Sequence, residues 1–352
     1  MAYPITITPT TKSRLQNIDF NNIPFGKYYA DHMFIANYAD GKWQNSRIVP
    51  FDNLSISPAT FSLHYGQLIF EGMKAYKDVS GNAQLFRPEQ NSERFNKSAL
   101  RMGMPEVPKE LFMEAIKELV KLDIGWIPVT EGSSLYVRPF MMAMDNHIGV
   151  KPTTEFQFMI ITSPCGPYFN RPVKVLVADT YVRAFSGGTG AAKAAGNYGA
   201  TMLPLKEAQK DGYDQVLWLD GRDFDTIEEA GTMNVFFAIN NVVYTPELDG
   251  NILDGVTRSS IIELLRKDGY EVHEQKVSIK EIIAAVENGT LTDAFGTGTA
   301  VLVIPIGTLG YKGKTYELSP VEKRVISPLI KKQMWDIMVS RSPDKFGWIT
   351  KL

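Results

Sequence analysis

The chain has 352 residues, of which 22% are charged, and its formal net charge is −2. This length exceeds the usual single-domain size, so we expect two domains with a substantial core. The near balance of charge gives no electrostatic basis for binding nucleic acid or an anionic membrane. Cys165 is the single cysteine, so no intrachain disulfide can form, and a reducing compartment fits the sequence.

Targeting segments and metal motifs are not recognisable in the sequence. The four histidines lack the spacing of metal ligands, and no apolar run approaches the length of a membrane span. The first twenty residues contain no continuous apolar segment of the secretory kind. We therefore expect a soluble cytoplasmic enzyme without a metal, a membrane partner or a nucleic-acid partner.

In the N-terminal half the pattern predicts hairpins and helices in alternation. A hairpin is expected over residues 32–50 because Asp40-Gly41 favours a tight turn, and a second over residues 75–86. A helix is expected to begin near Ser57-Pro58 and to run through residue 72. Further helices are predicted at 88–102 and 108–122, and strands at 134–144 and 154–163.

Residues 164–172 form the clearest break in the pattern, with three prolines and a glycine in nine residues. We interpret them as an interdomain linker between a domain of residues 1–163 and a domain of residues 173–352.

The second half continues the mixture of strands and helices. Strands are predicted at 173–179, 215–220 and 292–306, a strand pair at 234–245, and helices at 259–270 and 279–289. A final helical stretch at 321–338 is expected to be interrupted by Pro328. Because strands and helices do not alternate regularly as βαβ units, the fold class predicted is α+β rather than doubly wound.

Lys193 stands in an unusual stretch, Arg183 to Ala200, which reads RAFSGGTGAAKAAGNYGA. Small residues on both sides allow a flat ligand or another backbone to approach the lysine closely. A lysine shielded from water holds its charge less strongly and becomes nucleophilic, as a Schiff-base lysine must. The stretch alone is equally compatible with a glycine-rich surface loop that carries one solvated lysine.

Two phosphate-binding motifs are excluded at this stretch. A Walker loop requires Gly before the lysine and Ser or Thr after it, whereas Ala192 and Ala194 occupy those positions. The dinucleotide fingerprint requires a third glycine where Gly188 and Gly190 are followed by Ala191, Ala192 and Lys193.

A carboxylate and several hydroxyl-bearing turns follow the lysine. Glu229 precedes a turn that enters an apolar strand; if buried, it needs either a proton or a cationic partner such as a protonated pyridine nitrogen. The alternative is a glutamate at a strand edge in water. Turns at Gly231-Thr232, at 255–257 and at 296–300 can bind a phosphate through backbone N–H groups, with Arg94 and Arg183 as candidate cations.

Taken together, GTGAAKAAGNYGA, QVLWLD, EEAGTMNVFF, GVTRSS and FGTGTA resemble the branched-chain amino acid aminotransferases. Upstream, FGKYYADHM, LHYGQLIFEGMKAY, NSERF and SLYVRPF match the same family in the same order, so the likeness runs from about Phe25 to Tyr311. The longer, eukaryote-like form of the family fits better than the shorter bacterial form. The resemblance implies a fold type IV enzyme with a smaller N-terminal α/β domain and a larger cofactor-binding domain built on a β-barrel-like sheet.

The same resemblance implies that pyridoxal 5′-phosphate is the cofactor and lies between the two domains. Lys193 would hold it covalently and move the substrate proton, Glu229 would pair with the pyridine nitrogen, and Tyr198 would bind the phenolic oxygen. The remaining cofactor contacts implied are Arg94, Arg183, Thr232, Val256, Thr257 and Thr299.

The resemblance also implies a substrate pocket and a homodimer. Aromatic walls would come from Phe25, Phe70, Tyr136 and Tyr168. Tyr136 and Arg138 would bind the distal carboxylate of glutamate, and the amides of Thr299 and Ala300 the α-carboxylate. In such dimers Tyr65 and the loop at Ile148 and Val150 reach in from the second subunit.

The activity implied is reversible amino transfer between L-leucine, L-isoleucine or L-valine and 2-oxoglutarate, of use in branched-chain amino acid biosynthesis. Alternatives on the same fold are a D-amino acid aminotransferase and an aminodeoxychorismate lyase, and an alternative of another class is a phosphate-loop nucleotide-binding protein. Some animal members carry a CxxC motif after the GTGTA turn; Val301 and Ile304 occupy those positions here, which excludes thiol regulation at that place.

Overall fold

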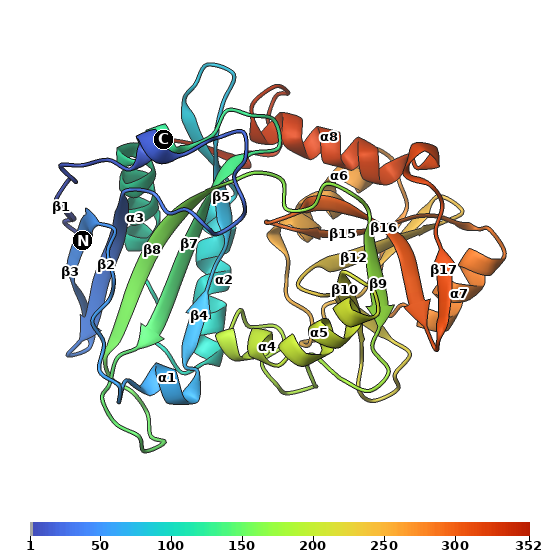
Figure 1. The fold of residues 1–352 in the computed structure, drawn as a ribbon, viewed down its shortest axis with the longest axis horizontal. Helices are drawn as coiled ribbons and strands as arrows, with labels where there is room; N and C mark the ends of the chain where they lie inside the picture. The colour runs from blue at the N-terminus through green and yellow to red at the C-terminus, as the bar shows by residue number, and fades with distance from the viewer. Residues whose placement is uncertain (1–2) are drawn as a thin grey trace. The chain divides into compact units, whose positions relative to one another are not determined.

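The computed structural model describes residues 3–352, and in this range the chain forms two compact units (Figure 1). Unit 1 contains the described chain as far as Tyr168, together with residues 192–196 and 335–352. Unit 2 contains Phe169–Ala191 and Asn197–Met334. No helix within residues 3–352 combines the length and the apolar character needed to cross a membrane.

Unit 1 is built on one mixed sheet, in which most neighbouring strands are antiparallel. The strand order is β1-β3-β2-β8-β7-β5-β6-β18, with β4 beside β7. The bounds are β1 Thr6–Ile7, β2 His32–Ala39, β3 Lys42–Pro50, β4 Leu68–Phe70, β5 Met73–Lys77, β6 Ala83–Phe86, β7 Ser134–Ala143, β8 Phe156–Cys165 and β18 Ile349–Lys351.

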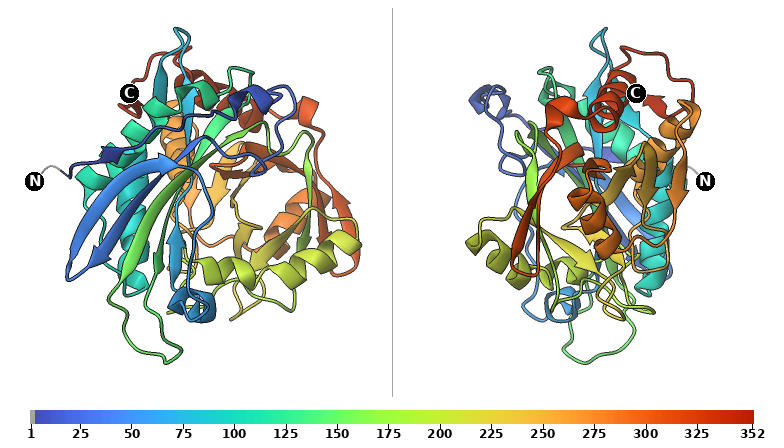
Figure 2. Two further views of the ribbon diagram at one scale, coloured as in Figure 1. Left: turned by 60° about the vertical axis from the view of Figure 1, so that its left-hand side comes forward. Right: turned by 90° about the vertical axis from the view of Figure 1, so that its right-hand side faces the viewer.

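Two amphipathic helices, α2 (Pro88–Arg101) and α3 (Lys109–Leu122), cover one face of this sheet. The left view of Figure 2 shows them in teal behind the blue and green strands. The short α1 (Phe61–Tyr65) and the 3-10 turns η1 (Leu15–Asn17) and η2 (Ile124–Trp126) complete the helical elements of this unit's first segment. Because strand side chains alternate, Leu135 and Val137 of β7 enter the helix-covered core while Tyr136 and Arg138 lie on the opposite face.

Unit 2 also has a mixed sheet, ordered β11-β10-β9-β16-β15-β12-β13-β14, with β17 beside β16. Its strands are β9 Val173–Val177, β10 Gln215–Leu219, β11 Ile227–Ala230, β12 Asn234–Ile239, β13 Val242–Thr245, β14 Val272–Glu274, β15 Leu291–Gly298, β16 Leu302–Tyr311 and β17 Lys314–Glu317. The helical elements that follow Lys193 in the chain are α4 Ala195–Gly199, α5 Met202–Lys210, α6 Val256–Lys267, α7 Ile279–Glu287, η3 Val321–Lys323 and α8 Ile326–Met338. Residues Ile279, Ile282 and Ile283 of α7 pack into the core of this sheet.

The predicted α+β class is confirmed, and so are the hairpin at 32–50, the helices α2 and α3, and the strand pair β12 and β13. The Asp40-Gly41 turn has positive φ at both residues, as the tight hairpin requires.

Three predicted elements are wrong. The helix expected through residue 72 ends at Tyr65, because Gly66 adopts a left-handed conformation and residues 68–70 instead pair with β7. The single strand expected at 292–306 is the antiparallel pair β15 and β16, joined by a turn after Gly298. Pro328 does not interrupt α8, because it lies in the first turn, where a missing N–H costs no intrahelical bond.

Two segments that the sequence-based division gave to the C-terminal domain pack with unit 1. Ala192 and Ala194 are buried in its core, and β18 extends its sheet by pairing with β6. The predicted linker, 164–172, begins with the last two residues of β8 and contains the step from Tyr168 to Phe169 at which the units change. The domain boundaries themselves stay a prediction.

Phe158 lies at the centre of the unit 1 core, and substituting it tests this description of the core. Its ring contacts those of Phe34, Phe95 and Phe112 at centroid distances of 5.4–5.7 Å, and it is fully buried. Phe158→Ala should destabilise the protein by about 3–5 kcal/mol, because it deletes these contacts and leaves a cavity. Leu100→Ala, at a position 75% exposed on α2, is the control and should change stability by less than about 0.5 kcal/mol. Chemical denaturation measures both; equal losses would contradict this description of the core.

Candidate active site

The backbone on both sides of Lys193 is fixed to unit 1. The Lys193 N–H donates to Ser98 Oγ on α2 at 2.9 Å, and the Lys193 carbonyl accepts from the Phe70 N–H at 3.0 Å. Ala194 forms an antiparallel bridge with Ile69 of β4. Since Ala192 and Ala194 are buried, the small residues around the lysine serve the close backbone approach that the sequence predicts.

The side chain of Lys193 lies over an aromatic ring. Its Nζ is 4.7 Å from the centroid of Phe70, and the guanidinium carbon of Arg138 is 4.6 Å from the same centroid. Ring faces attract cations electrostatically, and the attraction grows as water is excluded. Phe70 therefore brings the predicted catalytic lysine and the predicted substrate-binding arginine to one ring.

Three more of the predicted pocket residues are connected to Arg138 by a hydrogen bond and by contacts between aromatic rings. Arg138 donates to the Tyr136 hydroxyl at 3.0 Å, and Phe25 meets Tyr136 edge-on at 4.9 Å and Tyr168 at 5.1 Å. Unit 1 thus brings together Phe25, Phe70, Tyr136, Arg138, Tyr168 and Lys193, which we call the lysine cluster.

Gly72 explains the position of Tyr136 in this cluster. A Cβ atom on residue 72 would overlap the hydroxyl oxygen of Tyr136, so only glycine leaves space for the phenol. Sequence reasoning missed this residue, although it stands in the LIFEGMKAY motif.

Arg94, predicted to hold the phosphate, makes two hydrogen bonds to Glu71: Nε to Oε1 at 2.7 Å and a terminal nitrogen to Oε2 at 2.9 Å. Asn91 donates to Glu71 Oε2 at 2.8 Å. Burial alone would raise the pKa of Glu71, but Arg94, Lys193 and Asn91 outweigh it and hold that pKa below its ordinary value. Sequence reasoning missed Glu71, because a partner 23 residues away leaves no local signal.

In unit 2 the predicted carboxylate Glu229 is buried in β11 and is held from two sides. Its Oε1 accepts from the Leu253 N–H at 2.7 Å, and its Oε2 is 3.4 Å from Arg183 Nε. Arg183 also donates to the carbonyls of Asn251 and Gly190. The two residues that the sequence placed in one neighbourhood, Arg183 and Glu229, thus form a buried ion pair.

The predicted phosphate turns are also in unit 2. Val256 and Thr257 are buried in the first turn of α6, whose N-cap, Gly255, supplies no capping side chain. The first N–H groups of such a helix carry the positive end of its dipole and suit an anion. Thr299 and Ala300 occupy the turn between β15 and β16, Thr232 is exposed in the turn before β12, and Tyr198 is half-buried in α4.

The residues predicted to reach across a dimer lie on the surface of unit 1. Tyr65 is 40% exposed and donates to the Ile148 carbonyl at 2.5 Å, while Ile148 and Val150 are 70% and 81% exposed. The hydrogen bond joins Tyr65 to the loop that carries Ile148 and Val150.

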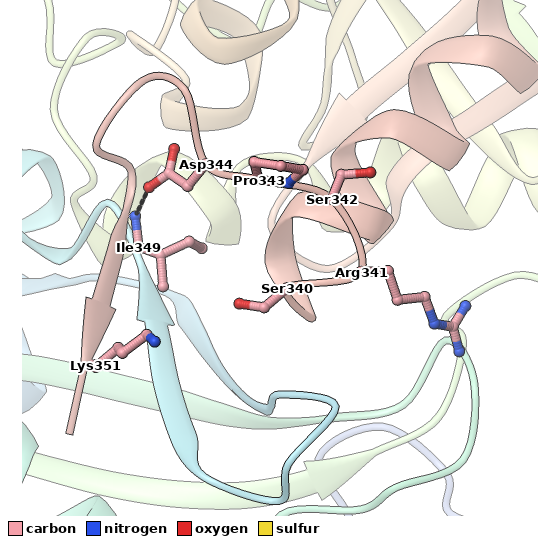
Figure 3. Close-up of a pocket in the computed structure, with 7 residues that line it drawn as sticks. All are labelled: Ser340, Arg341, Ser342, Pro343, Asp344, Ile349 and Lys351. Atoms are coloured by element: carbon pink, nitrogen blue, oxygen red, sulfur yellow. Dashed lines mark hydrogen bonds between the residues drawn. The ribbon is translucent and has the colours of Figure 1, made fainter.

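A groove of about 490 Å³ near the C-terminus contains none of the predicted site residues. Figure 3 shows its lining, in which Asp344 accepts from the Ile349 N–H at 2.8 Å and fixes the loop between α8 and β18. Its lining residues are Ser340, Arg341, Ser342, Pro343, Asp344, Ile349 and Lys351. Within residues 3–352, no group of three His, Cys, Asp or Glu side chains is placed to hold a metal ion.

Comparison with known proteins identifies the family of the chain. Residues 68–309 match the family described as amino-transferase class IV. The chain is 43% identical over 339 residues to branched-chain-amino-acid transaminase 1 of Bacillus subtilis (strain 168), covering 95% of each chain.

Two solved structures are similar over most of the chain. The branched-chain aminotransferase of Thermoproteus uzoniensis with norvaline has 25% identity and a TM-score of 0.75, covering 91% of this chain and 99% of that one. The branched-chain amino acid aminotransferase of Escherichia coli has 25% identity and a TM-score of 0.73, covering 91% and 98%. Because the family match covers residues 68–309 and the Bacillus subtilis relative is 43% identical over 95% of each chain, the chain belongs to the class IV aminotransferases.

Proposed function

We propose that this enzyme is a branched-chain amino acid aminotransferase that moves an amino group between L-leucine, L-isoleucine or L-valine and 2-oxoglutarate in a ping-pong cycle. The observation that carries the proposal is the lysine cluster: a lysine amine beside aromatic walls with a single arginine among them. Aromatic walls suit branched apolar side chains, and the arginine suits the second carboxylate of a dicarboxylic acid. The relatives named as branched-chain aminotransferases support the same assignment.

The residues present fit pyridoxal 5′-phosphate. The uncapped start of α6 offers N–H groups to a phosphate, and the buried carboxylate of Glu229 suits a protonated pyridine nitrogen. We propose that Lys193 holds the cofactor covalently and that Val256, Thr257 and Thr299 bind its phosphate, with Thr232 nearby. Arg94 would contribute its positive charge while Glu71 fixes its orientation, and Tyr198 would bind the phenolic oxygen.

When bound, this cofactor supplies an electron sink for breaking the substrate Cα–H bond. The chain's own contribution is to position and move the proton. Lys193 Nζ would take the proton from the substrate Cα and deliver it to C4′ of the cofactor, and its backbone bonds to Ser98 and Phe70 fix where the side chain begins. The amides of Thr299 and Ala300 would bind the substrate α-carboxylate.

Lys193→Ala tests the covalent role. The purified wild-type protein should show a yellow absorption band that L-leucine bleaches and 2-oxoglutarate restores. The variant should fold normally but lack turnover, because it has no amine to hold the cofactor or to move the proton. Lys210→Ala, at an exposed position at the end of α5, is the matched control and should behave as wild type.

Other outcomes of this measurement are equally informative. Full activity in Lys193→Ala would refute the role of the lysine. A yellow protein whose absorption band is unchanged by L-leucine but is bleached by D-alanine would indicate a D-amino acid aminotransferase of the same fold.

Arg138 is the residue that we propose for recognising 2-oxoglutarate and glutamate. Its guanidinium is held by Phe70 and by the Tyr136 hydroxyl, and its Nε is buried without a hydrogen-bond partner among the described residues. A distal carboxylate would supply the missing acceptor.

Arg138→Met should therefore raise KM for 2-oxoglutarate by about 10–100-fold, since a charge-assisted hydrogen bond contributes about 1.5–3 kcal/mol. KM for L-leucine should change by less than about threefold, because an apolar side chain makes no use of the charge. Arg101→Met, at the exposed end of α2, serves as the control. An equal loss for both substrates would contradict a role in distinguishing them.

We propose that the enzyme is a homodimer and acts in the cytoplasm, where its single, buried Cys165 would stay reduced. The support for the dimer is that Tyr65, Ile148 and Val150 are exposed apolar residues, and that a hydrogen bond joins Tyr65 to the loop that carries the other two.

The double variant Ile148→Asp/Val150→Asp should weaken dimerisation by at least about tenfold, because two carboxylates would be desolvated at the interface. Sedimentation velocity across a concentration series measures the change. Val129→Asp, at another position 81% exposed, is the matched control. An unchanged dimer in the double variant would place the interface elsewhere.

A further inference from the structure

Glu228, which immediately precedes Glu229 in β11, is buried and has one unusual partner. It is 1% exposed, and its Oε1 accepts from Asn251 Nδ2 at 2.9 Å. Its second oxygen, Oε2, and the side-chain oxygen of Asn251 are both buried and have no hydrogen-bond partner within residues 3–352. The two side chains therefore share one hydrogen bond and each retain one unsatisfied acceptor.

A proton on Glu228 Oε2 would supply a donor of the kind that the Asn251 side-chain oxygen lacks. A protonated carboxyl has one O–H donor and one carbonyl acceptor, which matches the acceptor and donor of a primary amide. Leaving two buried oxygens unpaired is costly, and leaving one of them charged costs more. The arrangement is thus the one expected for a neutral carboxyl that exchanges two hydrogen bonds with an amide.

The surrounding charges favour the same state. Arg183 is the cation that acts on Glu228, but it is already paired with Glu229. Asp220 and Asp249 add negative charge, each of them paired with Arg222. Burial is the main cause that raises the pKa of Glu228 from 4.5 to about 7, and the opposing effects of Arg183 and the Asn251 hydrogen bond are smaller.

We propose that Glu228 is a positioning residue that carries a proton in weakly acidic solution and shares it with Asn251 in a carboxyl–amide pair, so that Glu229 is then the only carboxylate bound to Arg183. The chemical class of the interaction is that of a carboxylic acid bound to a primary amide. No other molecule and no covalent step are involved.

The pair acts on Glu229 through a short segment of backbone. The Asn251 carbonyl accepts from Arg183, and two residues later the Leu253 N–H donates to Glu229 Oε1 at 2.7 Å. Fixing the Asn251 side chain therefore fixes both partners of Glu229. If Glu228 lost its proton, a second carboxylate would compete for Arg183 and the segment 251–253 would be less firmly held.

The variants Glu228→Gln and Glu228→Ala distinguish the effect of a neutral side chain from the effect of losing the side chain. Glutamine places a donor and an acceptor where the neutral carboxyl has them and adds one further N–H, whereas alanine leaves the Asn251 amide unpaired. Glu247→Gln, at an exposed position, is the control for adding an amide.

The first measurement is difference infrared spectroscopy of the purified protein during a pH titration. We expect a carbonyl-stretch band of a protonated carboxyl that disappears with a midpoint near 7, and that is absent from Glu228→Gln. A wild-type protein with the same spectrum as Glu228→Gln at about pH 6 would overturn the proposal.

The second measurement is thermal unfolding against pH. Because the folded pKa of Glu228 exceeds its unfolded value, its contribution to stability is complete below about pH 4.5 and is lost as pH rises through about 7. The Tm of Glu228→Gln relative to wild type should therefore rise by roughly 2–6 °C between about pH 5 and pH 8. Glu228→Ala should unfold at a lower temperature than Glu228→Gln throughout. A glutamine variant as unstable as the alanine variant would contradict a neutral pair.

The effect on turnover rests on the function proposed for Glu229. Wild-type kcat should fall as pH rises through about 7, and Glu228→Gln should remove that inflection while keeping the wild-type rate at about pH 6. The infrared and unfolding experiments need no catalysis. A protein that shows the band and the pH-dependent Tm but does not transaminate would keep this proposal and refute the proposed function.

Discussion

The backbone attachment of Lys193 to β4 and α2 is the constraint on which the rest of the site depends. One hydrogen bond on its N–H side and one on its carbonyl side hold the lysine backbone, so its position is set by the sheet of unit 1 rather than by its own loop. A glycine-rich stretch is flexible by composition. Here burial of Ala192 and Ala194 holds the stretch in place on both sides of the lysine. The lysine side chain then reaches the ring of Phe70, which belongs to β4.

Two of the buried glutamates, Glu71 and Glu228, illustrate two ways of accommodating a carboxyl away from water. Glu71 keeps its negative charge because a bidentate arginine and an asparagine satisfy both oxygens. Glu228 has an amide partner and a neighbouring arginine already bound elsewhere, so the neutral form is favoured. Partner type, rather than depth of burial alone, decides which form is stable, since both residues are almost wholly inaccessible.

Much of this could be predicted from the sequence, and the limits follow from distance along the chain. Periodicity located α2 and α3, and the Asp40-Gly41 turn located the first hairpin, because both signals lie within a few residues. The helix expected beyond Gly66 failed because pairing of β4 with β7, some seventy residues away, decides that segment. The ring partners in the lysine cluster came from a family resemblance. The pairs Arg94–Glu71 and Glu228–Asn251 each span 23 residues, and no local pattern predicts them.

The contact between Gly72 and Tyr136 has a consequence for how this enzyme could change its preferences. Residue 72 lies against the Tyr136 hydroxyl, so even a methyl side chain at this position would displace Tyr136. Arg138 donates to the same hydroxyl and would move with it. Laboratory evolution directed only at lining residues would overlook such a position. A library that varies residue 72 together with residue 136, replacing the phenol by a smaller ring or an aliphatic chain, would sample pocket shapes that neither single position reaches, because a side chain at residue 72 fits only when the phenol is removed.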